Sequence, residues 1–110
     1  MRGSIAILMT CHNRVATTLD CLKRLMPQLG SDDKVFLVDD GSTDGTGAKV
    51  RSEFPMIRVI DADASLYWAK GMRKAWGAAV DERSDWDAYL WLNDDTMLSP
   101  DAMEKMIVKD

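Results

Sequence analysis

Short apolar runs that alternate with segments of helical periodicity are the feature that most constrains the fold of this chain. The runs are mostly continuous rather than alternating, a pattern typical of parallel strands buried on both faces. They lie at 5–9, 35–38, 57–60 and 88–92. Each run is followed by a segment with helical signals, and parallel neighbours require such crossovers. The sequence therefore predicts an α/β fold, with an open, mainly parallel sheet and helices on both faces.

The predicted helices differ in the strength of their signals. Apolar residues recur at helical spacing over 15–29 and again over 69–80. The segment 44–54 predicts a weaker helix because its two glycines lower helix propensity. At 99–101, the sequence Ser-Pro-Asp supplies a cap, a first-turn proline and a first-turn acid, so a last helix is expected to begin there.

Composition narrows the possible partners and compartments. The 110 residues carry a net charge of −4, which gives no basic field for a nucleic acid backbone. No apolar run approaches the roughly 20 residues that span a bilayer. The apolar stretch near the start of the sequence is too short for the hydrophobic region of a signal peptide. Cys11 and Cys21 fit neither a CxxC motif nor a zinc ribbon, so two reduced thiols are expected. These features predict a cytoplasmic protein without a membrane span.

Polar side chains follow each predicted strand at the point where the strand ends. In open parallel sheets, ligands bind outside the carboxyl ends of the strands. The four polar segments are 10–14, 39–42, 61–63 and 93–96. A solvated turn is the simpler explanation for each of them, since Asp, Ser, Thr and Gly all favour turns.

The last of these segments is the sharpest sign of a metal site. Asp94 and Asp95 follow the apolar run 90–92, so a rigid strand end would hold both carboxylates. Mg²⁺ typically uses one or two carboxylates together with waters and substrate phosphates, and Mn²⁺ suits the same oxygen ligands. A pair of adjacent acids is also common in ordinary turns, so this segment alone leaves both explanations open.

Four longer stretches in a fixed order carry a family resemblance. They read IAILMTCHNR, VFLVDDGSTDGT, LYWAKGM and YLWLNDDT. Together they resemble the nucleotide-binding half of a family 2 glycosyltransferase with the GT-A fold, and LYWAKGM is similar to the wording of rhamnosyltransferase-like members. The resemblance runs from Ile5 to the end of the chain. It implies a nucleotide-diphospho-sugar donor, Mg²⁺ or Mn²⁺ as cofactor, and inverting transfer to a glycan or lipid-linked acceptor.

The resemblance also implies roles for individual residues. Thr10 and His12 match positions that line the base and ribose of the donor nucleotide, and Asp40 matches the acid that hydrogen-bonds the base. Asp94 and Asp95 match the DxD-type motif. Asp95 is then the direct metal ligand, while Asp94 lies nearer the ribose or the waters of the metal.

Other positions depart from the family pattern. Lys70 stands where glycine is frequent, and we place it near the donor diphosphate. Asn93 stands where many members have a first aspartate. Family members are considerably longer, and their second half supplies the acceptor site and the catalytic base, so the catalytic residue is unknown here. We therefore expect 1–110 to form one donor-nucleotide-binding domain, the N-terminal part of a longer GT-A domain.

Two functions of other classes remain open. A receiver-like phosphoacceptor domain suits the length and the LVDD wording at 37–40, although the acidic pair of that family follows the first strand rather than the second. A binding-only nucleotide module is the other. An unpaired edge on the last strand would in addition favour a homo-oligomer.

The aromatic residues also have two possible explanations. Tyr67 and Trp68 would wall a sugar pocket or anchor the core, since aromatic side chains before a helix do both. Trp76, Trp86 and Trp91 are interpreted as core or edge packing.

Overall fold

The computed structural model describes residues 3–103, and in this part of the chain four strands form one parallel sheet. The strands are β1 (Ile5–Cys11), β2 (Lys34–Asp40), β3 (Arg58–Ala62) and β4 (Ala88–Trp91). The helices are α1 (Val15–Leu25), α2 (Thr46–Glu53) and α3 (Tyr67–Glu82), with the short 3-10 helix η1 (Met26–Gln28) after α1. The strand order is β3-β2-β1-β4, and every pair of neighbours is parallel.

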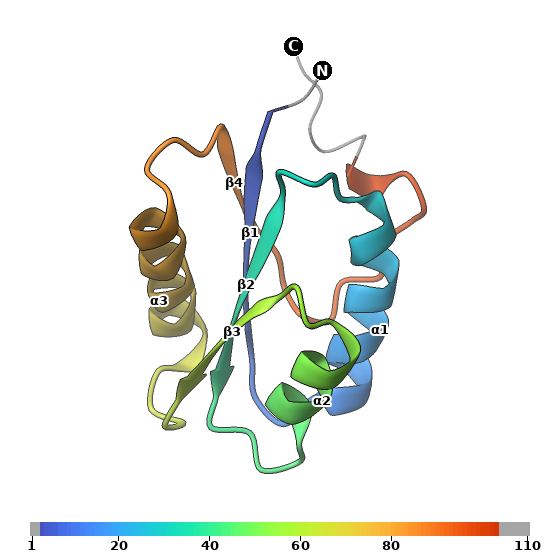
Figure 1. The fold of residues 1–110 in the computed structure, drawn as a ribbon. Coiled ribbons are helices and arrows are strands. Elements are labelled where there is room, and N and C mark those ends of the chain that lie inside the picture. The colour runs from blue at the N-terminus through green and yellow to red at the C-terminus, as the bar shows by residue number, and fades with distance from the viewer. Residues whose placement is uncertain (1–2, 104–110) are drawn as a thin grey trace.

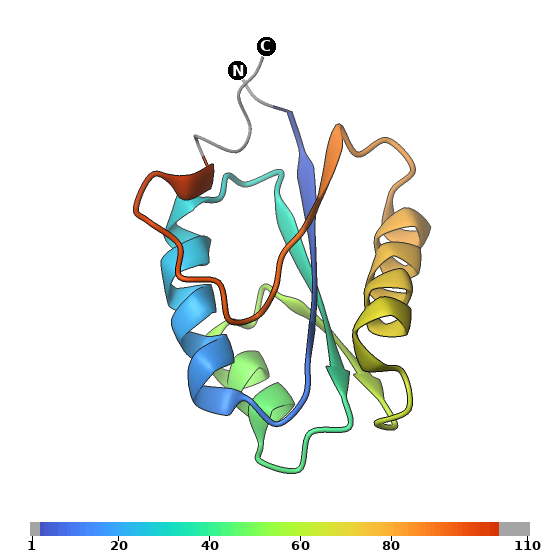
Figure 2. The ribbon, with the colours of Figure 1, turned by 180° about the vertical axis from the view of Figure 1, so that it is seen from behind.

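Helices cover both faces of the sheet. Figure 1 shows α3 on one face and α1 with α2 on the other, and Figure 2 shows the same layers from behind. The predicted fold class is confirmed. Each helix runs back from the carboxyl end of one strand to the start of another, so the loops that precede the helices all lie at one edge of the sheet.

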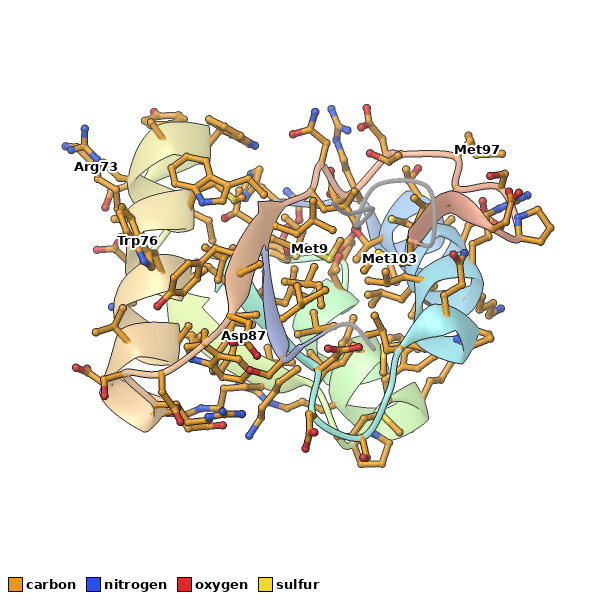
Figure 3. All side chains as sticks on the ribbon, turned by 90° about the horizontal axis from the view of Figure 1, so that it is seen from above. Met9, Arg73, Trp76, Asp87, Met97 and Met103 are labelled. Atoms are coloured by element: carbon orange, nitrogen blue, oxygen red, sulfur yellow. The ribbon has the colours of Figure 1, made fainter. Side chains whose placement is uncertain are left out.

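The two central strands are buried on both faces, as their continuous apolar runs predict. Alternate residues of β1 face opposite layers, because successive side chains of a strand point to opposite sides. Ile5, Ile7 and Met9 join the hydrophobic cluster under α1 and α2, whereas Ala6 and Leu8 join the cluster under α3. Figure 3 shows Met9 on the α1 side of the sheet, where the buried Met103 also lies.

The two outer strands correct the expectation of burial on both faces. No residue of β3 or β4 is fully buried, and most residues of β4 are exposed. Both strands are edges of the sheet in the part of the chain that the structure describes, so only one side of each has a hydrogen-bonded neighbour. A continuous apolar run therefore marked a strand correctly but did not distinguish a central strand from an edge strand.

The helix boundaries differ from the predicted ones by a few residues. α3 begins at Tyr67, two residues earlier than its apolar pattern. The predicted helix 15–29 ends at Leu25 and continues as η1, which contains Pro27. Residues 102 and 103 are helical, and the rest of the predicted last helix lies outside the described residues. Within residues 3–103, no helix has both the length and the apolar character needed to cross a bilayer.

Candidate functional site

The carboxyl ends of β1, β2 and β4 surround a cavity of about 470 Å³. It is lined by Thr10, Cys11, His12, Arg14, Asp40, Ala64, Tyr67, Trp68, Asn93, Asp94 and Asp95. Five of the six residues predicted to bind donor or metal are in this set. Thr10, Asp40 and Asp95, which are far apart in the sequence, therefore meet at one edge of the sheet, as the strand-end pattern predicts.

Asp39 and Asp40 at the end of β2 serve opposite faces of the sheet. The Asp39 carboxylate lies on the α2 side, where a Cβ on Gly47 would come within 2.2 Å of its Oδ2 atom. The Asp40 carboxylate lies on the α3 side and binds the backbone before that helix. Adjacent like charges are tolerated because the strand points them in opposite directions.

The Asp40 carboxylate is engaged by backbone amides. Its Oδ1 accepts from the N–H of Ala64 at 2.9 Å, and its Oδ2 accepts from the N–H of Leu66 at 3.1 Å and of Tyr67 at 2.9 Å. The Leu66 N–H also lies 3.3 Å from Oδ1. Asp40 thus caps the start of α3, because these amides have no partner within the helix. It lines the cavity, yet most of its acceptor capacity is already used.

The segment that Asp40 holds has an unusual backbone. Ala64 has a φ of 74° and Tyr67 has a φ of 56°, values that residues other than glycine seldom adopt. Gly41 has φ of 70°, and a Cβ there would lie 2.6 Å from the backbone nitrogen of Ala64. Such conformations persist where surrounding contacts hold them. Asp40 and Gly41 together set the shape of this wall of the cavity.

The loop after β2 is hydrogen-bonded to the loop after β1 rather than arranged as a phosphate cradle. Asn13 Oδ1 accepts from the Thr43 N–H at 2.7 Å, and the Asn13 N–H donates to Ser42 Oγ at 2.9 Å. Asp44 accepts from the N–H of Val15 at 3.1 Å and from the N–H of Thr46 at 3.0 Å. The hydrogen bonds from Thr46 and Val15 lower the pKa of Asp44. These contacts join the starts of α1 and α2.

Thr10 and His12 line the cavity from β1 and the loop that follows it. The Thr10 hydroxyl donates to the Val38 carbonyl at 3.2 Å, and a Cβ on Gly71 would come within 2.3 Å of that hydroxyl. His12 Nδ1 lies 2.6 Å from the Asp40 carbonyl oxygen. Because a carbonyl oxygen only accepts, Nδ1 carries the proton, and the other ring nitrogen, Nε2, lies 3.3 Å from the side-chain nitrogen of Asn13, which is a donor.

Asp94 and Asp95 have different surroundings. Asp94 is buried, with 7% of its surface exposed, and its Oδ2 accepts from the Thr18 hydroxyl at 3.1 Å. Burial is the main cause that raises the pKa of Asp94. Asp95 is exposed, and Arg14 contacts both acids: its Nη1 lies 3.3 Å from Asp95 Oδ2 and 3.5 Å from Asp94 Oδ1.

The donor set at this point fits a hard divalent cation. One positive group, the Arg14 guanidinium, already contacts both carboxylates. Within residues 3–103, no three His, Cys, Asp or Glu side chains gather into a metal site. Water and ligand oxygens would have to complete the coordination, as is usual for Mg²⁺.

An aromatic row extends from the cavity along β4. The indole N–H of Trp68 donates to Asn93 Oδ1 at 3.0 Å, and the Trp68 ring lies 5.8 Å from that of Trp91. Trp76 in turn lies 6.1 Å from Trp91 and 5.9 Å from Tyr89. All four rings remain partly exposed, so these residues pack at the edge of the structure. Trp86, in contrast, belongs to the core and packs against Phe36 at 5.9 Å.

One predicted site residue lies outside the cavity, and two residues that contact the acidic pair were not predicted. Lys70 lies on α3 and is exposed, and it is not among the residues that line the cavity. Arg14 and Thr18 were given no role, although both contact the Asp94–Asp95 pair. Arg14 could have been predicted from its place in the polar segment after β1, because that segment lies at the same edge of the sheet as two adjacent acids with no basic residue beside them in the sequence.

Two solved structures share the fold of this chain. The described fold matches S. aureus TarS 1–349 with a TM-score of 0.75 and 17% identity, over 94% of this chain and 31% of that one. It also matches the mannosyltransferase PcManGT from Pyrobaculum calidifontis, solved with GDP-Man and Mn²⁺, with a TM-score of 0.69 and 18% identity, over 92% of this chain and 30% of that one. The chain therefore has the α/β fold of GT-A glycosyltransferases.

The family follows from the sequence. The model of glycosyl transferase family 2 matches residues 6–109, and the chain belongs to this family. Hyaluronan synthase of Streptococcus pyogenes is 29% identical over 107 residues, which cover 93% of this chain and 25% of the synthase. The chain thus spans about a quarter of the length of this relative. Family membership removes the phosphoacceptor alternative.

Proposed function

We propose that this chain binds the donor of a glycosyltransferase, a nucleotide-diphospho-sugar, together with Mg²⁺ or Mn²⁺. The observation that carries the proposal is the convergence of Thr10, His12, Asp40, Asp94 and Asp95 on one cavity from three strand ends. The cavity is at the edge of the sheet where open α/β folds bind their ligands. The sugar would then pass, with inversion, to a glycan or lipid-linked acceptor.

Asp95 is proposed as the direct metal ligand, and Asp94 as its partner. Asp95 is exposed and contacts Arg14, so its oxygens can turn toward an ion. Asp94 is held by the Thr18 hydroxyl and is better suited to orient metal-bound water or the ribose. The cation would neutralise the diphosphate leaving group, which this acidic surface would otherwise repel.

The base and ribose are proposed to lie near Thr10 and His12. The protonated Nδ1 of His12 fixes its ring against the Asp40 carbonyl, and a ligand that contacts Nε2 would have to share or replace its contact with Asn13 Nδ2. Direct acceptance of a base N–H by Asp40 would require one of its backbone contacts to be released. Lys70 remains proposed as a diphosphate contact, which would require its flexible side chain to reach the cavity. No residue of the chain is assigned as the catalytic base.

The test is calorimetry of the chain with UDP, GDP and dTDP, each with and without Mn²⁺. We expect one of these nucleotides to bind in a Mn²⁺-dependent way, and Asp95→Asn to weaken that binding at least about tenfold, as loss of a metal contact does. Asp32→Asn, an exposed acid at the opposite edge of the sheet, is the matched control and should bind normally. No binding of any nucleotide would refute the proposal. Binding without sugar transfer would favour a binding-only module.

The compartment and assembly are also proposals. Cys11 and Cys21 are free and buried, and burial raises the pKa of both thiols, that of Cys21 to about 11, so neither is a reactive thiolate, in agreement with the cytoplasmic setting we propose. The outer edge of β4 favours pairing with β4 of a second copy. Light scattering should show a dimer, and a clean monomer across concentrations would contradict it.

A further inference from the structure

Arg14 has a position that an ordinary surface arginine does not have. It precedes α1, and a single nitrogen of its guanidinium contacts both carboxylates of the Asp94–Asp95 pair, at 3.5 and 3.3 Å. Half of its side chain is exposed, so the group can swing away without disturbing the core. Among the described residues that line the cavity, Arg14 is the one lysine or arginine.

The acids that Arg14 contacts have little other positive charge near them. Asp94 also accepts a hydrogen bond from the Thr18 hydroxyl, which is a neutral donor. In residues 3–103, Arg14 is the one cation within ion-pair distance of Asp94 or Asp95. Two adjacent carboxylates repel each other, and the cost of keeping both ionised falls when a cation is shared between them.

We propose that Arg14 is a built-in counter-cation of the metal site, which a divalent ion must displace and which then serves the donor diphosphate. This inference rests on the proposed function, because it takes Asp94 and Asp95 as the metal site. Arg14 and the metal ion compete for the same carboxylate oxygens. Arg14 therefore lowers affinity for the bare ion, and once displaced it is the nearest cationic side chain for an anionic ligand.

This role differs from that of a simple surface ion pair, because removal of Arg14 should change the affinity for Mn²⁺ and the affinity for the nucleotide in opposite directions. An exposed ion pair contributes about 0–1 kcal/mol to stability and has no connection with ligand binding. A counter-cation affects two equilibria in different directions. Its removal should strengthen the binding of Mn²⁺ alone and weaken the binding of a nucleoside diphosphate in the presence of Mn²⁺.

The experiment measures free Mn²⁺ by electron paramagnetic resonance in titrations of the full chain and of three variants. Arg14→Ala should bind Mn²⁺ alone roughly three- to tenfold more tightly than the unsubstituted protein, the scale of one or two exposed ion pairs. Arg14→Lys keeps one positive charge and should stay closer to the unsubstituted protein. Arg24→Ala, whose guanidinium pairs with Asp20 on the surface of α1, is the control for a change in net charge.

Calorimetry with UDP, GDP and dTDP in saturating Mn²⁺ completes the test. The nucleotide that binds the unsubstituted protein should bind Arg14→Ala about tenfold more weakly, since a charge-assisted hydrogen bond is lost. Equal Mn²⁺ affinity in all four proteins, or equal tightening in Arg14→Ala and Arg24→Ala, would overturn the role of Arg14 and leave the proposed function intact. Absence of Mn²⁺ binding in every protein, with and without nucleotide, would overturn the proposed function itself.

Discussion

The acidic pair at the end of β2 and the acidic pair after β4 lie at the same edge of the sheet but are held in different ways. Asp39 and Asp40 are within the strand, both are buried, and the Asp40 carboxylate accepts from three backbone amides. Asp94 and Asp95 come after their strand, where a threonine hydroxyl and an exposed guanidinium are their partners.

The difference shows how two similar pairs of residues acquire different roles. A strand directs neighbouring side chains to opposite faces, so Asp39 packs against α2 and Asp40 binds the backbone at the start of α3. A loop imposes no such separation, so both acids of the second pair reach the same arginine. The first pair is therefore part of the fold, and the second is free to exchange its partner.

The largest effect is expected from loss of the Asp40 carboxylate. Asp40→Ala leaves the amides of Ala64, Leu66 and Tyr67 without their acceptor and should lower the free energy of unfolding by about 4 kcal/mol. Urea unfolding followed by circular dichroism measures the change. Asp95→Ala, from the other pair, should remain within about 0.5 kcal/mol of the unsubstituted protein. Similar losses in both variants would contradict the comparison.

A second test concerns the turn that follows the first pair. Gly41→Ala adds a Cβ 2.6 Å from the Ala64 nitrogen at a left-handed φ, and we expect it to destabilise the fold by about 3 kcal/mol. Gly45→Ala has the same left-handed backbone but no atom within 4 Å, so it should cost about 1 kcal/mol. Thermal unfolding of the two variants compares them directly. Equal effects would show that the wall around Ala64 yields easily.

The smallest expected effect is the pH dependence of stability that Asp94, from the second acidic pair, causes. Because burial raises the pKa of Asp94 in the folded state, its contribution to stability is fully present below the unfolded value of about 3.8 and is lost as pH rises through the folded value. Asp94→Asn does not ionise, so its stability relative to the unsubstituted protein should increase from pH 4 to pH 7 and then level off. The gain should be smaller than the loss in Asp40→Ala. Urea unfolding at both pH values, with Asp95→Asn as control, measures it.

Much of the fold could be predicted because local patterns carry it. Continuous apolar runs identified all four strands, and helical spacing identified α1 and α3. The exposure of β4 was not predictable, because it depends on which strand lies at the edge rather than on the residues of the strand itself. The strand order is a property of the whole sheet.

The site was predictable in its location and less so in its contacts. The motifs and the positions of the strand ends predicted that Thr10, Asp40 and Asp95 lie close together, and all three line one cavity. It did not show that backbone amides occupy the Asp40 carboxylate, because these amides belong to an irregular segment whose φ angles no pattern indicates. Nor did it show the Arg14 contact, which joins loops 81 residues apart in the chain.

The edge-to-face indoles beside the cavity have a practical consequence for spectroscopy. Trp68 lies at the cavity wall with its N–H bonded to Asn93, and its ring packs edge-to-face against Trp91, which neighbours Trp76. Excited states of chromophores this close couple with one another, and their emission responds to a charged neighbour. The protein thus carries its own optical probe, so occupancy of the cavity can be followed by intrinsic fluorescence and near-ultraviolet dichroism without an attached dye.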